Sequence, residues 1–309
     1  MSNKVYLIAG PTAVGKSSVA IELAKKLNGE IVNCDSVQVY KYLDIGSAKP
    51  NSTEMQSVKH HLFSIVDPDY NMTVATYQKL ALACIDNILE RGKTPVICGG
   101  TGLYINAILY DMDFAGNIDD GSRRTELEKM AEENGNDYMH QYLTAIDPES
   151  AKRIHPNNIR KVIRAIEAFE LGDGIKSLDE CPLNPNYDFK FYALKMDREP
   201  LYERINERVD DLISRGLLNE VQSLVERGYK DTAAMKSIGY KELVEYINGE
   251  TDLETAIDNI KKNTRHYAKR QYTWFNRYDN VNWINVKNED SVTDITYKIF
   301  NEVLEKEGK

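Results

Sequence analysis

The chain has few of the residues from which metal sites, disulfide frameworks and membrane spans are built. Its four cysteines are widely spaced and form no C-x-x-C pair: Cys34, Cys84, Cys98 and Cys181. That spacing is typical of a reduced intracellular protein and predicts no cysteine-based metal site. No apolar run approaches the ~20 residues of a transmembrane helix, and the first residues do not have the pattern of a secretory signal. We therefore expect a cytoplasmic protein that does not associate with membranes.

Positive charge is also in short supply. The 309 residues include 39 Lys and Arg against 48 Asp and Glu, which gives a formal net charge of −9. This balance argues against a general nucleic-acid-binding protein, although local basic patches are compatible with it. The apolar fraction of 42% is that of an ordinary globular protein and supports one large domain or two smaller ones.

A phosphate-binding pattern stands near the N-terminus. Eight consecutive residues fit G-x-x-x-x-G-K-[ST]: Gly10, Pro11, Thr12, Ala13, Val14, Gly15, Lys16 and Ser17. An apolar run at 5–9 precedes the pattern and predicts a buried strand, and apolar residues at helical spacing follow it at 19–27. Strand, glycine loop and helix are the context in which this pattern binds a di- or triphosphate. We expect Lys16 to reach the outer phosphate and the Ser17 hydroxyl to bind Mg²⁺.

Short apolar segments and helical patterns alternate after the glycine loop. Strands are predicted at 30–35 and 94–98, and a helix is predicted at 73–91. This alternation favours an α/β protein with a P-loop NTPase-like parallel sheet flanked by helices. Ligands bind at the carboxyl ends of such strands, and Ser17, Asp35 and Thr101 each follow one. One reacting centre is therefore expected to collect these three residues.

The texture of the sequence changes near residue 114. The polar, helix-forming stretch at 114–188 predicts a mostly helical insertion domain, and 1–113 and 189–309 form the predicted catalytic core. Strand character returns at 189–196, followed by a helix from Pro200 to about Arg227 and a final packed helix after Glu289.

Several candidate site residues allow more than one interpretation. Asp35 either holds Mg²⁺ through water, acts as a general base, or only caps the following segment. The glycine-rich Gly99–Tyr104 segment either approaches a ligand or needs glycine only for the torsions of a tight turn. Arg204 and Arg208 either face phosphates or pair with neighbouring carboxylates.

Three basic patches interrupt the acidic average. One is Lys152–Arg164 in the insertion, a second is the carboxylate-free stretch between Asp258 and Asp279, and a third is the pair Arg123-Arg124. Aromatic residues are interleaved with the second patch, which is typical of surfaces that bind a sugar–phosphate backbone and unpaired bases. The alternative is a solvated helix whose aromatic residues pack into the core. Together the patches indicate a directed groove for RNA.

With these residues assembled, the chain resembles the tRNA dimethylallyltransferases, also called tRNA isopentenyltransferases, of the bacterial type. The matching segments run in family order: Gly10–Ser17, Asp35–Tyr40, Asp44–Pro50, Gly99–Tyr104, Ile154–Asn158 leading to Arg160 and Arg164, and Ile238–Glu242. The resemblance implies that the glycine loop binds dimethylallyl diphosphate and that the acceptor is the exocyclic amine of adenosine 37 in tRNA. Relatives with a C-terminal zinc finger would show paired Cys and His beyond the core, and their lack here suits the bacterial type. Nothing in the sequence demands more than a monomer, so we expect one.

The resemblance assigns roles to individual residues. Lys16, a Mg²⁺ ion on Ser17 and Arg208 would stabilise the departing diphosphate, Asp35 would accept the proton of the amine, and Thr101 would align amine and leaving oxygen. The insertion would grip the anticodon stem-loop. The expected tRNA contacts are Asp35, Ser36, Val37, Gln38, Thr101, Arg123, Asn158, Ile159, Arg160, Lys161 and Arg164.

Three rival functions share part of this pattern. A P-loop kinase for a small molecule would use Lys16, Ser17 and Asp35 but has no need of a basic RNA grip. A prenyltransferase acting on free adenine nucleotides would not need the long insertion. A non-catalytic RNA-binding module would leave the convergence of the glycine loop, Asp35 and Thr101 unused.

Overall fold

The structure is a computed structural model that describes residues 3–112, 122–170 and 180–307. The chain divides into two compact units. The first comprises Met1–Leu109 and Asn184–Lys309, and the second is Tyr110–Leu183. The boundaries expected from the sequence were 114 and 188, and the first of these lies in 113–121, outside the described residues. Each unit contains a hydrophobic core of its own.

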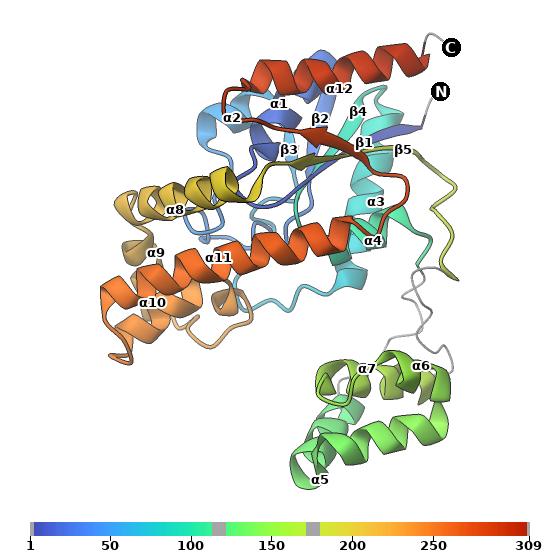
Figure 1. Ribbon diagram of the computed structural model, residues 1–309, viewed down its shortest axis with the longest axis vertical. Coiled ribbons are helices and arrows are strands. Elements are labelled where there is room, and N and C mark those ends of the chain that lie inside the picture. Colours follow the sequence, from blue (N-terminus) through green and yellow to red (C-terminus); the bar gives the residue numbers. More distant parts are fainter. Residues whose placement is uncertain (1–2, 113–121, 171–179, 308–309) are drawn as a thin grey trace. The chain divides into compact units, whose positions relative to one another are not determined.

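The first unit is built on a six-stranded sheet in the order β3-β2-β4-β1-β5-β6 (Figure 1). The strands are β1 Lys4–Ala9, β2 Gly29–Asn33, β3 His60–His61, β4 Thr94–Cys98, β5 Asp188–Lys195 and β6 Asn282–Asn285. Every pairing is parallel, and β1 lies between β4 and β5, with Tyr6 aligned to Val96 and Lys190. The expected parallel α/β fold is confirmed, whereas β3 and β6 were not predicted.

Helices flank this sheet (Figure 1). They are α1 Lys16–Lys26, α2 Ser52–Ser57, α3 Val74–Glu90, α4 Gly102–Leu109, α8 Arg198–Ser214, α9 Leu217–Glu226, α10 Tyr240–Ile247, α11 Leu253–Phe275 and α12 Val292–Glu307, with a 3-10 turn at Ala234–Lys236. In α1 the buried residues Val19, Ala20 and Leu23 recur at helical spacing and join the core on which α12 also packs. A separate cluster, the second core, joins α8, α9, α10 and α11 to the chain segment at 39–43.

The prediction of one continuous helix from Pro200 to about Arg227 is wrong. The chain forms α8 and α9 instead, and the break falls at Gly216, whose φ is 97°. This left-handed conformation is easily reached only by glycine, and it turns the chain so that Leu217 enters the second core at 0% exposure. The two helices therefore bury different faces of one amphipathic stretch.

Among its described residues, the second unit contains three α-helices: α5 Ser122–Ile146, α6 Pro148–Arg153 and α7 Ile159–Glu170. Gly135, with φ 83° and ψ 171°, interrupts α5. Leu127, Met139 and Val162 are each 0% exposed and belong to the core of this unit.

None of the helices in the described ranges combines the length and the apolar character that crossing a membrane requires.

Candidate active site

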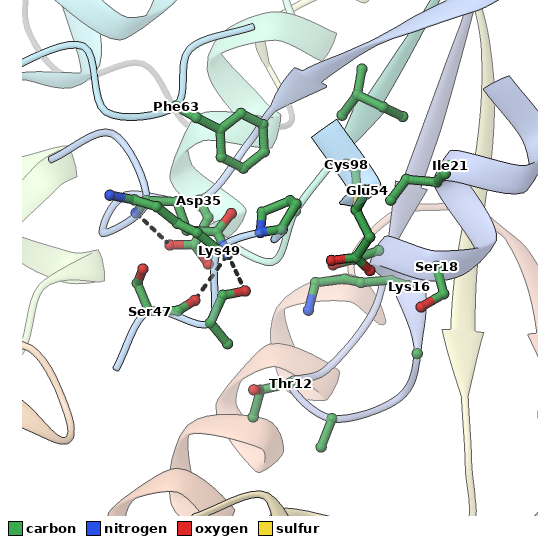
Figure 2. Close-up of a pocket in the computed structure, with 18 of the residues that line it drawn as sticks. Thr12, Lys16, Ser18, Ile21, Asp35, Ser47, Lys49, Glu54, Phe63 and Cys98 are labelled. Atoms are coloured by element: carbon green, nitrogen blue, oxygen red, sulfur yellow. Dashed lines mark hydrogen bonds between the residues drawn. The ribbon is translucent and has the colours of Figure 1, made fainter. Parts of the chain in front are cut away.

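Two adjoining cavities lie where the strands of the first unit end. The first has a volume of about 190 Å³ and is bounded by the glycine loop, the ends of β2 and β4, and the segment around Lys49 (Figure 2). The second has a volume of about 300 Å³ and reaches between α8, α9 and α11. They share five lining residues, Thr12, Asp35, Ser47, Arg208 and Tyr267.

The glycine loop forms one wall of the first cavity through Thr12, Ala13, Gly15, Lys16 and Ser17. Helix α1 begins directly after Gly15, with no side-chain cap and no acidic residue in its first turn. Its first backbone N–H groups therefore remain available, together with the positive end of the helix dipole, to an anion. The other three residues of the pattern, Gly10, Pro11 and Val14, do not line either cavity.

Two cations face the first cavity. Figure 2 shows the Lys16 amine pointing into it from the start of α1, and Arg208 enters from α8. Burial lowers the pKa of both side chains, while the carboxylate of Asp35 acts in the opposite direction. An anionic ligand would relieve this cost of burial. Arg204, one turn earlier on α8, instead donates to the Asn288 carbonyl oxygen at 3.4 Å.

Asp35 lies at the junction of the two cavities, two residues beyond the end of β2. Its Oδ1 accepts hydrogen bonds from the backbone N–H groups of Val37 at 2.9 Å and Gln38 at 3.4 Å. The capping interpretation is therefore correct as far as Oδ1 is concerned. The same carboxylate also lines both cavities, so capping and a role toward a ligand are compatible.

Thr101 follows β4 and lies behind Ser36 without lining either cavity. Its Oγ1 accepts a hydrogen bond from the Ser36 N–H at 3.0 Å, and its side chain also bonds to Tyr267. The structure thus brings Thr101 to the Asp35-Ser36 turn, where Ser36, Val37 and Asp35 border the second cavity.

The end of β4 carries a thiol where many ATPases carry a metal-linked carboxylate. Burial raises the pKa of Cys98 to about 11, although the nearby Lys16 cation opposes this rise. Cys98 therefore stays neutral near pH 7. It contributes no negative charge to the wall that the glycine loop faces.

The segment from Asp44 to Pro50 matched the family pattern but had no predicted role, and it forms much of the opposite wall. The buried Lys49 ammonium donates to the Tyr40 carbonyl oxygen, to Asp44 Oδ1 at 2.6 Å and to Ser64 Oγ at 2.8 Å. With its three protons bound within the protein, Lys49 shapes the wall and has no donor left for a phosphate.

A carboxylate from α9 holds this segment from behind. The two oxygens of Glu220 accept hydrogen bonds from the backbone N–H groups of Asp44, Ile45 and Gly46 at 2.7–3.1 Å. The Tyr240 hydroxyl donates to Glu220 at 2.7 Å. Glu220 was not predicted, because the backbone groups that it holds lie 174 to 176 residues away in the sequence. Tyr240 lies in the matched segment Ile238–Glu242 but had no predicted role.

The two cavities differ in chemistry. Charged and hydroxyl side chains dominate the first, whereas the second contains apolar side chains of Val209, Leu212, Leu217, Ile238 and Ile260. An anion bound at α1 would thus sit beside Asp35, with space for an uncharged group on the far side. This arrangement suits the transfer of a group between an anionic donor and an acceptor that approaches Asp35.

The residues of the second unit that were expected to bind tRNA lie at the start of α5 and around the start of α7. Asn158 precedes α7, and Ile159, Arg160, Lys161 and Arg164 belong to it. Asn158, Arg160 and Lys161 are exposed. Arg123 on α5 binds both oxygens of Glu170 at 2.7 and 2.8 Å and pairs with Glu126 at 2.9 Å.

Oxygen ligands for a Mg²⁺ ion are present in the first cavity, where Ser17 and Asp35 both line the wall. Within the described ranges, no group of three or more His, Cys, Asp and Glu residues could hold a metal by itself. These two facts are compatible, because Mg²⁺ keeps several waters and is usually shared between one or two protein oxygens and substrate phosphates.

Comparison with known proteins assigns the chain to a family. The model of the IPP transferase family matches residues 38–278. The chain belongs to the IPP transferase family. It is 49% identical to a tRNA dimethylallyltransferase of Alkaliphilus oremlandii, over 96% of this chain and 95% of the relative. It is 48% identical to the enzyme of the same name from Acetivibrio thermocellus, over 94% of both chains.

Solved structures agree with this assignment to the IPP transferases. The tRNA isopentenylpyrophosphate transferase of Bacillus halodurans is 41% identical, with a TM-score of 0.73 and 99% of each chain covered. A eukaryotic dimethylallyltransferase acting on tRNA is 29% identical, with a TM-score of 0.84, and covers 99% of this chain and 80% of its own. The resemblance expected from the motifs and the expected prenyltransferase class are thereby confirmed.

The IPP transferase motifs indicated part of the first cavity, and its lining residues without a predicted role include Glu54, His60, Phe63 and Gln271. The adjacent His60 and His61 both form hydrogen bonds within the protein. His60 Nδ1 bonds the Val58 carbonyl oxygen at 2.7 Å, and His61 Nε2 bonds Glu30 at 2.7 Å. Only His60 also reaches a cavity.

Proposed function

We propose that this chain transfers the dimethylallyl group of dimethylallyl diphosphate to the exocyclic amine of adenosine 37 in tRNA and releases diphosphate. The observation that carries the proposal is the meeting of the two cavities at Asp35 and Arg208, with Lys16 and the free end of α1 on the anionic side. Membership of the IPP transferase family supplies the class of donor and acceptor.

The proposed reaction is a displacement at the allylic carbon. The bond between that carbon and the diphosphate oxygen breaks, and its electron pair leaves with diphosphate. The lone pair of the amine forms the new carbon–nitrogen bond, and the amine proton passes to Asp35. An amine conjugated to a purine is a poor nucleophile, so stabilising the leaving group is the larger task. Lys16 and Arg208 perform it by neutralising the charge that develops on diphosphate.

A Mg²⁺ ion is part of this proposal. The Ser17 hydroxyl would hold it together with the diphosphate and waters, and it would supply further charge neutralisation to the leaving group. Thr101 then acts through its bonds to Ser36 and Tyr267, which fix the turn that carries Asp35.

We further propose how tRNA is bound. The second unit would contact the anticodon stem-loop through Asn158, Ile159, Arg160, Lys161, Arg164 and Arg123, while residues 35–38, whose turn Thr101 supports, would receive the target nucleotide. An adenosine inside a stacked loop hides its amine, so the base has to be flipped out to reach Asp35. We propose that the enzyme acts in the cytoplasm as a monomer.

The test is transfer of label from radiolabelled dimethylallyl diphosphate into unmodified tRNA with Mg²⁺, comparing the wild type with Asp35→Asn. Asparagine keeps an oxygen that can accept the Val37 and Gln38 N–H groups, so the turn should survive while the base is lost. Asp69→Asn, an exposed substitution outside both cavities, is the control.

We expect incorporation by the wild type and the control, and near loss by Asp35→Asn with tRNA still bound. The proposal fails if the wild type leaves tRNA unlabelled and instead transfers the γ-phosphate of ATP to a small acceptor. Lys16→Ala distinguishes the transferase from a non-catalytic RNA-binding module. For the transferase, we expect loss of the labelled product while tRNA binding is retained.

A further inference from the structure

Helix α11 presents one side to the glycine-rich turn between β4 and α4. Tyr267, Gln271 and Trp274 are spaced by four and three residues and therefore share a face of the helix. Tyr267 bonds to the Thr101 side chain, and Gln271 Nε2 donates to the Gly100 carbonyl oxygen at 2.9 Å. Trp274 lies against Gly102. Three successive contacts thus fix the turn to one helix.

The glycines of this turn are required by close approach. A Cβ at Gly100 would lie 2.2 Å from Gln271 Nε2, and a Cβ at Gly102 would lie 2.3 Å from the Trp274 ring. Neither glycine has a φ in the left-handed region, so the explanation by turn torsions does not apply to them. Glycine is needed at these two positions because side chains of α11 occupy the space that a Cβ would fill.

Gln271 also holds the glycine loop. Its Oε1 accepts a hydrogen bond from the Thr12 N–H at 2.9 Å, across 259 residues of sequence, and its side chain lines the first cavity. Because the Thr12 N–H is a donor and the Gly100 carbonyl is an acceptor, only one orientation of the amide satisfies both. Gln271 is 4% exposed, so neither bond can be exchanged freely for water.

We propose that Gln271 is a positioning residue for the proposed prenyl transfer. It sets the distance between the diphosphate-binding turn at Thr12 and the turn at Gly100-Thr101, on which Ser36 and the acceptor side rest. The inference rests on the proposed function, because a displacement needs donor carbon and acceptor nitrogen in line. Gln271 contacts neither reacting atom in this proposal, so its loss should affect alignment more than the binding of either substrate.

The first test compares Gln271→Met with the wild type. Methionine fills a similar volume and makes neither hydrogen bond. Misalignment by about 1 Å costs on the order of 10²-fold in rate, so we expect kcat to fall between tenfold and a hundredfold. The KM for dimethylallyl diphosphate and the directly measured affinities for diphosphate and tRNA should change less than about threefold, since both binding surfaces persist.

Gln78→Met is the matched control. Gln78 on α3 donates to the Ala107 carbonyl oxygen of α4 at 2.8 Å and lines neither cavity. The same chemical change there removes an anchor of α4 but leaves the Thr12–Gly100 span intact. We expect a lower midpoint of thermal unfolding with kcat per active site unchanged. A fall in kcat equal to that of Gln271→Met would assign the effect to general loosening and overturn the proposal.

The second test uses Gln271→Glu and its pH profile. An ionised carboxylate offers two acceptors and loses the bond to Gly100, whereas the protonated acid offers one donor and one acceptor and restores both bonds. Lys16, Arg208 and Asp35 line the same cavity and bear on this carboxyl, so the wild type must be measured in parallel. The ratio of variant to wild-type kcat should rise as pH falls, by up to tenfold per unit above the pKa of the introduced carboxyl.

The outcomes separate this inference from the proposed function. Absence of prenyl transfer by the wild type overturns the function. Transfer by the wild type with an unchanged kcat in both Gln271 variants, or a ratio that does not depend on pH, overturns only the positioning role. A large rise in KM at constant kcat would also overturn it, because that result assigns Gln271 to donor binding.

Discussion

The two edges of the parallel sheet, formed by the carboxyl ends and the amino ends of its strands, differ in how buried charges are neutralised. At the carboxyl edge, Lys16 and Arg208 line a cavity, and burial lowers the pKa of both cations. At the amino edge, Glu30 is 1% exposed and its carboxylate is paired with Arg91, Lys93 and His61 at 2.6–2.9 Å. At the carboxyl edge, an anionic ligand would neutralise the buried cations. At the amino edge, side chains of the protein itself neutralise the buried carboxylate.

This difference shows which edge is built for stability and which for binding. The cations around Glu30 cover it from solvent, and their hydrogen bonds hold the pKa of Glu30 well below its usual range. At the opposite edge the charges of Lys16 and Arg208 are held at a cost in stability. A stored electrostatic cost of this kind is typical of functional sites.

The largest effect is expected when the carboxyl edge loses its charge. Lys16→Met should lower kcat/KM for prenyl transfer by roughly 10³-fold, because a donor to the developing charge of diphosphate disappears. The same change removes a buried cation, so the midpoint of thermal unfolding should rise by about 2 °C. Transfer assays and calorimetry on one preparation check both results. A simultaneous loss of activity and stability would contradict the contrast between the two edges.

Removing charge at the amino edge should have the reverse outcome. Glu30→Gln leaves Arg91, Lys93 and His61 without their shared carboxylate, so the free energy of unfolding should fall by about 2 kcal/mol. Urea unfolding measures this loss, and transfer activity per folded molecule should stay at the wild-type level. Glu22→Gln removes an exposed pair with Lys25 and should cost less than about 0.5 kcal/mol.

Acid should reduce the difference in the free energy of unfolding between the wild type and Glu30→Gln. The pKa of Glu30 is lowered on folding, mainly by the hydrogen bonds of Arg91, so its contribution is fully present above the unfolded pKa of about 4.3. Below that value the unfolded chain gains a proton that folded Glu30 still lacks, and the contribution declines. The gap between wild type and Glu30→Gln, followed by urea unfolding from pH 7 to pH 3, should therefore narrow only below about pH 4.5.

The smallest effects concern RNA contacts in the second unit. Arg160 is exposed on α7, whereas the Arg123 guanidinium is bound by Glu170 and Glu126. Arg160→Gln should lower tRNA affinity and reduce the salt dependence of binding by about one ion, as for a lost phosphate contact. Arg123→Gln should reduce the salt slope by less than one ion, because Glu170 and Glu126 already neutralise much of its charge, and it should lower the thermal midpoint. A change of slope for Arg123→Gln of the same size would show that RNA competes with Glu170.

Contiguous signals in the sequence predicted the parts of the fold that depend on neighbours along the chain. The strand before Gly10, the loop and α1 were predicted because eight consecutive residues encode one geometry. The central strands β4 and β5 were predicted because apolar runs mark strands buried on both faces. Strand β3 was not, since its two residues extend only because Ile31 and Val32 lie beside them.

The site was predictable to the same extent. Asp35 and Ser17 follow strand ends and could be placed by topology alone. Gln271, Glu220 and Lys49 act through contacts with backbone groups, and for the first two those groups lie 171 to 259 residues away. The hydrophobic periodicity of a sequence carries no signal for hydrogen bonds between such distant residues. The break at Gly216 was visible as a glycine in the sequence, but its left-handed torsion depends on Leu217 finding the second core.

The position of β1 in the sheet has a consequence for biosynthesis. β1 is among the first elements to leave the ribosome, yet one of its two neighbours, β5, begins only at Asp188. At 5–20 residues per second, the stretch between β4 and β5 takes roughly 5–20 s to synthesise. During that time the helices of the second unit, with their own core, emerge complete, while a central strand keeps an open edge. The nascent half-sheet thus exposes an unpaired strand edge, the feature that promotes aggregation in partly folded chains.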